Sequence, residues 1–156
     1  MGVGKSSVAR HLADLLKCQR MDLDFFIEKK EGRKIADIID SEGEAAYRLI
    51  ETVNLAQLLD QSNAQVISLG GGTWTIEENR YMIHKKGLTS IWLESTFEHC
   101  WYNIKFSRKD RPLARNKEKA MKLFEERKKF YCLADWHFII KPEFSSMDIA
   151  RQIFDE

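Results

Sequence analysis

The sequence predicts an α/β fold, a three-layer sandwich in which a parallel sheet lies between layers of helices. Short β-prone runs alternate with longer stretches of helical periodicity along the 156 residues, which is the order expected of a parallel sheet. One glycine-rich segment opens the first helix, and another directly follows a buried strand candidate. Ligands of such folds bind at the carboxyl ends of the strands. The length fits a single domain over residues 1–156.

The amino-terminal half predicts mainly helices. The first covers about residues 5–17, and apolar residues mark one of its sides: Val8, Leu12, Leu15 and Leu16. Residues 19–23 are a short extended piece that leads into Asp22-Leu23-Asp24. Helices are expected over residues 34–40 and 44–61. In the longer of these, an apolar row recurs at helical spacing: Leu49, Val53, Ala56 and Leu59.

The carboxyl-terminal half alternates strands and helices. Three β-prone runs predict strands: residues 64–69, 89–93 and 137–140. Helices are expected to about residues 86, 131 and 154, with a further one after residue 95. Three of them begin with a capping box: Thr75 with Glu78, Ser95 with Glu98, and Ser145 with Asp148. The charged stretch 107–117 contains an Arg-Pro step and predicts an exposed loop.

Composition excludes several classes of protein. The 25 basic and 24 acidic residues give a formal charge of +1, which lacks the basic excess typical of nucleic-acid binders. The three cysteines are widely spaced and form no C-x-x-C pair, which indicates thiols in a reducing compartment. No apolar run reaches the length of a membrane span. We expect a cytoplasmic monomer, or an organellar protein whose targeting segment is absent from this sequence.

The chain begins with the second half of a phosphate-binding P-loop: Gly2, Val3, Gly4, Lys5, Ser6 and Ser7. Glycines let backbone N–H groups turn toward a phosphate, and the helix N-terminus adds partial positive charge. Lys5 would bridge the outer phosphates, and Ser6 would hold Mg²⁺. The full pattern G-x-x-x-x-G-K-S/T needs a glycine that falls before Met1, so a flexible glycine-rich start is an equal alternative.

Asp22 and Asp24 are candidates for chemistry on a phosphoryl acceptor. In an extended segment their carboxylates point to the same side. One would hold Mg²⁺ through water, and the other would accept a proton from a substrate hydroxyl. A lone D-x-D is more typical of an acidic turn with solvated charges, and that alternative stays open.

Glycines and arginines complete the candidate site. Three glycines directly follow the buried strand, which favours a ligand close to the backbone over a simple turn: Gly70, Gly71 and Gly72. Arg48 and Arg127 lie on separate predicted helices, and each could clamp a carboxylate, although a single arginine is more typical of an ordinary surface. Arg111 lies in the charged loop, which could close over a nucleotide or be merely a solvated charge run.

In their order, these motifs resemble the shikimate kinases, P-loop enzymes related to nucleoside monophosphate kinases. The segments that carry the resemblance are GVGKSS, MDLDFFIEKKEGRKIADI, EGEAAYRLIE, ISLGGGT, RPL and ERKKFY followed by LAD. The most specific part is D-x-D-x-x-I-E-x-x-x-G followed by GE-x-x-F/Y-R-x-x-E. The resemblance implies a shikimate kinase-like P-loop NTPase fold. It also implies ATP-dependent phosphorylation of the 3-hydroxyl of shikimate, on the pathway to chorismate and the aromatic amino acids.

The resemblance assigns roles on the phosphate side of the site. Lys5 and Ser6, with the glycine-rich segment, would serve the ATP phosphates and Mg²⁺. Asp22 would lie near the metal. Arg111, in a lid over about residues 107–117, would reach ATP, and closure of the lid would exclude water.

It assigns the acceptor side as well. Asp24 would bind the reacting hydroxyl and act as its base. Arg48 and Arg127 would grip the carboxylate of shikimate, and Gly71 with its neighbours would line the ring. Catalysis would then consist mainly of positioning and charge neutralisation.

The sequence departs from the family at its start. The family's first strand, which lies in the middle of the sheet, and the first P-loop glycine are missing, so two strand edges are expected to be unpaired. We therefore expect that roughly ten further residues precede Met1 in the native protein. A chain that begins at Met1 is expected to bind ATP weakly or not at all. Two alternatives remain: another small-metabolite kinase of this fold, such as a gluconate kinase, and a catalytically silent binding module.

Overall fold

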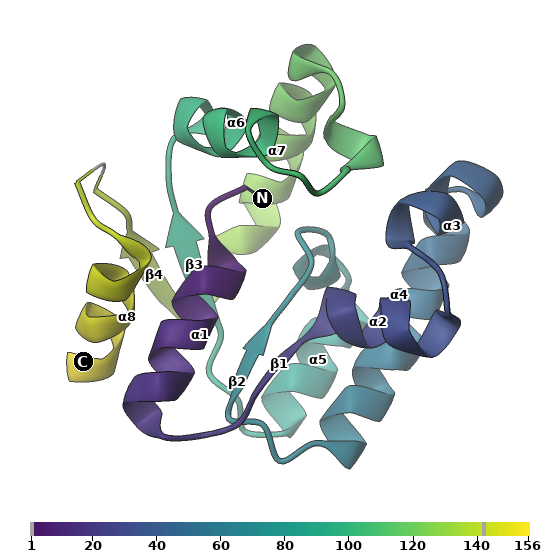
Figure 1. Ribbon diagram of the computed structural model, residues 1–156. Coiled ribbons are helices and arrows are strands. Elements are labelled where there is room, and N and C mark those ends of the chain that lie inside the picture. The colour runs from purple at the N-terminus through teal and green to yellow at the C-terminus, as the bar shows by residue number, and fades with distance from the viewer. Residues whose placement is uncertain (1, 142) are drawn as a thin grey trace.

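Four short strands form two separate parallel sheets in the computed structural model, which describes residues 2–141 and 143–156 (Figure 1). Strand β1 (Arg20–Asp22) pairs with β2 (Val66–Ser68), and β3 (Ile91–Glu94) pairs with β4 (Trp136–Ile139). The register places Arg20 opposite Val66 and Ile91 opposite Trp136. The prediction of a parallel α/β fold is confirmed, but the strands do not form one continuous sheet.

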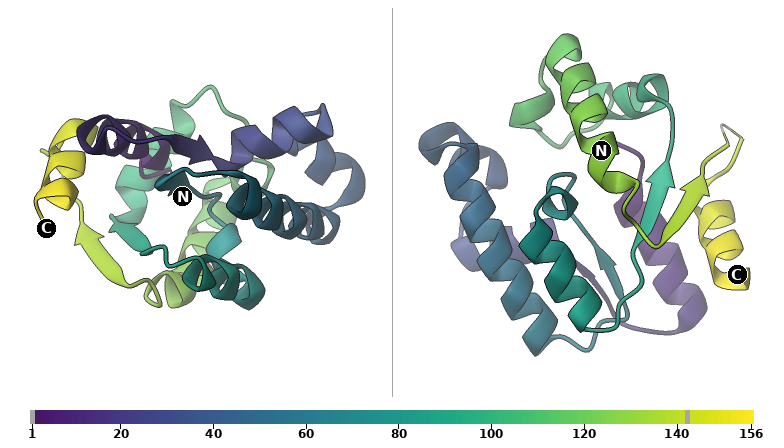
Figure 2. Two further views of the ribbon diagram at one scale, coloured as in Figure 1. Left: turned by 90° about the horizontal axis from the view of Figure 1, so that it is seen from below. Right: turned by 180° about the vertical axis from the view of Figure 1, so that it is seen from behind.

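Helices surround the strands (Figures 1 and 2). Their bounds are α1 (Lys5–Leu16), α2 (Leu23–Glu31), α3 (Ile35–Glu42), α4 (Glu44–Gln61), α5 (Glu77–Lys85), α6 (Phe97–Lys105), α7 (Lys117–Tyr131) and α8 (Ser146–Asp155). Short 3₁₀ turns lie at Thr73–Thr75 and Pro112–Ala114. Helix α1 packs against α8 and β2. Helices α6 and α7 and the loop between them lie at the end toward which β3 points (Figure 1).

Helix α2 was not predicted, and its presence corrects the extended reading of Asp22-Leu23-Asp24. The strand ends at Asp22, whose side chain accepts a hydrogen bond from the Phe25 N–H and thereby caps α2. Asp24 lies in the first turn of that helix. The two carboxylates are therefore placed by a cap and a helical turn, and not by the alternation of a strand.

Capping was predicted correctly for one helix and wrongly for two. The capping box of Ser145 and Asp148 is present at α8. Helix α6 is capped by Thr96, one residue after the predicted Ser95. Thr75 does not cap α5, because its hydroxyl donates instead to the Gly72 carbonyl within a 3₁₀ turn. A hydroxyl near a helix start has competing backbone partners, and sequence spacing does not decide between them.

Two main apolar clusters hold the helices on the strands. One joins α2, α3, α4 and α5 around Leu23, Ile27 and Leu55, and the other joins α1 and α8 to β3 around Val8 and Ile149. Among the described residues, no helix is long and apolar enough to cross a membrane.

The buried face of α4 differs from the predicted one. Leu59 is buried, but Leu49 and Val53 are 73% and 56% exposed. The face toward the core instead carries two polar residues, Glu51 and Asn54, with Tyr47, Leu55 and Leu58. Glu51 and Asn54 can be buried because they form hydrogen bonds within the protein. Their presence on the inner face interrupts the apolar periodicity of the helix. Leu16 of α1 is likewise exposed, contrary to the predicted apolar side.

Two leucines of α4 offer a matched test of this orientation. Leu55 is 0% exposed, and Leu49 is 73% exposed. The substitution Leu55→Ala is expected to lower the free energy of unfolding by about 3 kcal/mol, because it leaves a cavity in the core. Leu49→Ala is expected to change it by less than about 0.5 kcal/mol. Urea unfolding followed by circular dichroism measures both values, and equal losses would show that the assigned face is wrong.

Candidate active site

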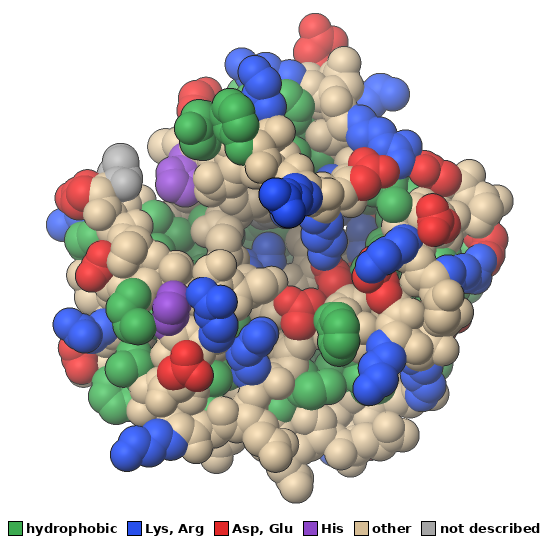
Figure 3. All heavy atoms as spheres, in the orientation of Figure 1, with side chains coloured by type: hydrophobic (Ala, Val, Ile, Leu, Met, Phe, Trp, Pro, Cys, Tyr) green, Lys and Arg blue, Asp and Glu red, His purple; other side chains and the backbone are tan. Residues whose placement is uncertain are grey.

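A cleft of about 1860 Å³ opens at the carboxyl ends of β1 and β2. Basic and acidic side chains line the hollow near the centre of the face in Figure 3. All the candidate site residues of the sequence line this one cleft: Gly2, Val3, Gly4, Lys5, Ser6, Ser7, Asp22, Asp24, Arg48, Gly70, Gly71, Gly72, Arg111 and Arg127. The structure thus brings together segments that are far apart in the chain.

The glycine-rich segment turns directly into α1. Gly2 and Gly4 have φ values of 70° and 88°, a left-handed backbone that other residues rarely adopt. A Cβ on Gly2 would also clash with the Cys100 carbonyl. The Gly4 carbonyl accepts hydrogen bonds from the N–H groups of Ser7 and Val8, at 3.0 and 3.1 Å. The first turn of α1 therefore presents its remaining N–H groups to the cleft, as an anion site requires.

Three cations converge on the cleft. Burial lowers the pKa of Lys5, Asp24 opposes this shift, and the charges of Arg127 and Arg111 reinforce it. Burial also lowers the pKa values of Arg111 and Arg127. A buried cation whose pKa is lowered further by neighbouring cations, as that of Lys5 is, is stabilised by an anion placed beside it. The electrostatics of the cleft therefore favour a multiply charged anion.

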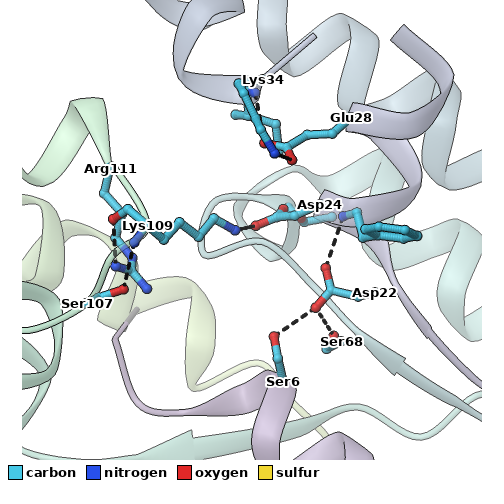
Figure 4. A network of polar contacts seen from close by, with 12 residues as sticks. Ser6, Asp22, Asp24, Glu28, Lys34, Ser68, Ser107, Lys109 and Arg111 are labelled. Atoms are coloured by element: carbon cyan, nitrogen blue, oxygen red, sulfur yellow. Dashed lines mark hydrogen bonds and ion pairs between the residues drawn. The ribbon is translucent and has the colours of Figure 1, made fainter. Parts of the chain in front are cut away.

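Asp22 is held by three hydrogen bonds (Figure 4). The hydroxyls of Ser6 and Ser68 each donate to its Oδ2 at 2.7 Å, and the Phe25 N–H donates to Oδ1 at 3.1 Å. Burial favours protonation of Asp22, but these hydrogen bonds outweigh it and hold the pKa below its usual range. A carboxylate beside a hydroxyl supplies the hard oxygen donors that Mg²⁺ prefers, so Ser6 and Asp22 fit the predicted metal site.

Asp24 faces the loop between α6 and α7. The Lys109 ammonium from that loop forms an ion pair with its carboxylate (Figure 4). On the other side, a Cβ on Gly70 would lie 3.0 Å from both the Asp24 Oδ1 and the Glu51 Oε1. Glycine at position 70 therefore leaves room for the carboxylates, which explains part of the glycine run that followed the strand.

Arg48 is fixed by a buried acid. Its Nη1 lies 2.5 Å from an oxygen of Glu51, which is 0% exposed and also accepts a hydrogen bond from Thr73 at 2.6 Å. Burial disfavours the charged guanidinium, but Glu51 outweighs it and raises the pKa of Arg48. A Cβ on Gly72 would collide with this guanidinium. Glycine at position 72 thus lets Arg48 lie flat against the backbone.

Helix α7 closes the opposite side of the cleft. Arg127 is 8% exposed, and Tyr131 one turn later donates a hydrogen bond to the Gly71 carbonyl at 2.6 Å. The charge of Arg48 is among the causes that lower the pKa of Arg127. The guanidinium groups of Arg48 on α4 and Arg127 on α7 therefore line the same part of the cleft.

The segment between α6 and α7 is a loop with one 3₁₀ turn, and residues 107–114 line the cleft. Besides Lys109, it carries Arg115, which bonds Asp40 of α3 at 3.0 and 2.8 Å and Asp110 within the loop. The sequence analysis did not single out four residues of this site: Glu51, Lys109, Arg115 and Tyr131. Glu51 ends the GE-x-x-F/Y-R-x-x-E motif and could have been singled out, whereas nothing in a charged loop distinguishes one lysine from another.

The two acids that contact Arg48 provide a test. Glu51→Gln is expected to lower the free energy of unfolding by about 3 kcal/mol, because it leaves the guanidinium without its buried counterion. Glu44→Gln removes the half-exposed partner, 3.2 Å from Nη2, and is expected to cost less than about 1 kcal/mol. Chemical unfolding at pH 7 measures both. A loss for Glu44→Gln as large as that for Glu51→Gln would contradict the assigned hierarchy.

Comparisons with known proteins agree with this geometry. The family model described as shikimate kinase matches residues 1–156. The shikimate kinase of Persephonella marina is 38% identical over 135 residues, which cover 86% of this chain and 81% of the relative.

Solved structures are similar over almost the whole chain. The shikimate kinase of Acinetobacter baumannii in complex with shikimate has a TM-score of 0.89 and 31% identity, covering 99% of this chain and 87% of that one. The shikimate kinase of Aquifex aeolicus has a TM-score of 0.79 and 30% identity, covering 98% and 89%. The family model, the identity and the shared fold together show that this chain belongs to the shikimate kinase family.

Proposed function

We propose that the protein transfers the γ-phosphoryl group of ATP to the 3-hydroxyl of shikimate. The observation that carries the proposal is the meeting, in one cleft, of an anion-binding helix start, a carboxylate and two arginines on separate helices. Membership of the family supports phosphoryl transfer, and the relative from A. baumannii was solved in complex with shikimate.

The phosphate side of the cleft would bind the nucleotide. Backbone N–H groups at the start of α1 and the Lys5 ammonium would hold the phosphates. Ser6 and Asp22 would hold Mg²⁺, which neutralises charge on the phosphates when bound. Arg111 would bring a further cation to the transferring group. These groups would stabilise the charge that develops during transfer.

The acceptor side would orient the alcohol. Arg48 and Arg127 would bind the carboxylate of shikimate, and Arg48 is held in place for this by Glu51. The glycines at positions 70–72 would let the ring lie close to the backbone. Asp24, which lies between the acceptor side and the helix start of α1, would accept the proton of the 3-hydroxyl. In this arrangement the carboxylate of shikimate and the phosphates of ATP would be bound by different groups of the cleft.

The segment 107–117 would act as a lid within a single domain, residues 1–156. Its contacts with Asp24 and Asp40 are those of a closed loop. Closure would exclude water, which competes with the alcohol as acceptor. We propose further that the protein is a cytoplasmic monomer. It would act on small molecules and not on nucleic acid or membranes. Its near-balanced charge supports the proposal that it does not bind nucleic acid.

An ADP-release assay with shikimate and gluconate in parallel tests the acceptor. Turnover with shikimate is expected of the native protein, with the residues that are expected to precede Met1. Turnover with gluconate alone would replace the proposal by a gluconate kinase, and turnover with neither would favour a binding module. Thermal unfolding with and without shikimate separates binding from catalysis, because a ligand of the native state raises the unfolding midpoint.

Asp24→Asn tests the base. The substitution keeps the size of the side chain but removes its ability to accept a proton, so kcat is expected to fall by about 10²- to 10⁴-fold. Asp37→Asn, on the first turn of α3, is the control and is expected to leave kcat unchanged. Steady-state rates at saturating ATP and shikimate measure both, and a kcat retained in Asp24→Asn would rule out this base.

Arg48→Lys tests the carboxylate site. A lysine retains the charge but loses the planar pair of donors, so the KM for shikimate is expected to rise at least about tenfold, while the KM for ATP changes little. Arg33→Lys, on an exposed arginine paired with Glu42, is the control. Initial rates over a grid of both substrates give both constants. An effect on the KM for ATP alone would place Arg48 on the nucleotide side.

A further inference from the structure

Lys109 reaches across the cleft from the loop between α6 and α7 to the first turn of α2 (Figure 4). Its ammonium forms an ion pair with Oδ2 of Asp24, a residue that lies 85 positions earlier in the chain. Both residues line the cleft, and the side chain of Asp24 is only 23% exposed. A lysine in a charged loop commonly extends into solvent, whereas this one is directed inward onto the proposed catalytic base.

The backbone of Lys109 is fixed on both of its sides (Figure 4). Its N–H donates a hydrogen bond to Ser107 Oγ at 3.1 Å, and its carbonyl accepts one from Arg111 Nη1 at 3.3 Å. The guanidinium that would bring a cation to ATP thus also holds the peptide unit from which Lys109 extends. One short segment of the loop therefore presents two cations to the cleft.

The two oxygens of Asp24 face different groups. Oδ1 lies toward Gly70, where a Cβ would approach it to 3.0 Å, and Oδ2 holds Lys109. The ring of the acceptor would lie along the glycines, so Oδ1 can receive the reacting hydroxyl while Lys109 stays on Oδ2. An ammonium has three N–H donors, and a single carboxylate oxygen leaves the other two for further acceptors.

Phosphoryl transfer brings negative charge to this place. The bond between the γ-phosphorus and the β–γ bridging oxygen breaks, and its electron pair leaves with ADP. The 3-oxygen of shikimate forms the new bond to phosphorus, and the proton of that oxygen passes to Oδ1 of Asp24. A cation that is bound to the same carboxylate lies beside the acceptor oxygen, where it stabilises the oxygens of the transferring group.

We propose that Lys109 is a further catalytic residue of this transfer. In the closed cleft its ammonium keeps one N–H on Oδ2 of Asp24 and donates the others to oxygens of the transferring phosphoryl group. It thereby places a positive charge at the acceptor end of that group, while Lys5 and the glycine-rich segment hold the phosphates at the donor end. This role rests on the proposed function, because it requires that Asp24 binds the reacting hydroxyl.

Lys109→Met tests the role, because it keeps the length of the side chain and removes the charge. In the native protein, kcat at saturating ATP and shikimate is expected to fall about 10²-fold, as when one donor to a transition state is removed. Lys109→Arg returns a positive charge and is expected to recover most of this loss. Lys122→Met on α7, whose parent side chain is 80% exposed, is the matched control and should keep the parent kcat.

A transition-state analogue separates catalysis from a role in fastening the loop. ADP with aluminium fluoride and shikimate imitates the transferring group, and Lys109→Met is expected to weaken its binding by about the same factor as kcat. Binding of ADP and of shikimate without fluoride is expected to change less than about threefold. Titration calorimetry measures all three affinities, and a lysine that only fastens the loop would weaken them alike.

Three results would overturn the role of Lys109. The first is an unchanged kcat in Lys109→Met, and the second is an equal loss of affinity for ADP, shikimate and the analogue. The third is tighter binding of shikimate with an undiminished kcat, because it would show that the ammonium blocks Asp24. A parent protein without turnover of shikimate would overturn the proposed function as well, so the two failures are distinguishable.

Discussion

The Asp22 carboxylate ties together four elements that build the cleft. It ends β1, caps α2, and accepts hydrogen bonds from Ser6 at the start of α1 and Ser68 at the end of β2. A carboxylate accepts several such bonds only while it is ionised, and its depressed pKa keeps it so. The helix start that would bind phosphate and the turn that carries Asp24 are thus fixed by one group.

Charge balance organises the rest of the cleft. Acids inside it have partners: Glu51 holds Arg48, and Asp24 holds Lys109. Burial lowers the pKa values of the cations Lys5, Arg111 and Arg127. The cleft therefore favours anions, because a bound phosphate or carboxylate stabilises the charged forms that burial disfavours.

The sequence predicted the fold class and most elements, because those depend on local periodicity. Helix α1, helix α4 and the capping box of α8 were found with nearly correct bounds. Helix α2 was missed, because the pattern D-x-D is compatible both with a strand and with an acid that caps a helix. Leu49 and Val53 were placed on an apolar row, whereas the core takes up Glu51 through hydrogen bonds that no periodicity records.

The candidate site divides in the same way. Positions within motifs could be read from the sequence, and the structure gathers them in one cleft. Their partners, such as Lys109 for Asp24 and Arg115 for Asp40, come from tertiary contacts between distant segments, and a charged loop gives no sign of which side chain will make them. The roles of the motif residues in catalysis remain predictions.

The close approach of Gly72 to Arg48 has an evolutionary consequence. A side chain at position 72 and a guanidinium at position 48 compete for the same volume. A larger residue at position 72 therefore either displaces the guanidinium from its present place or requires a shorter residue at position 48. Either change would weaken the binding of a carboxylate by Arg48. The substrate specificity of this fold can therefore change through a substitution at glycine, a residue that has no functional group.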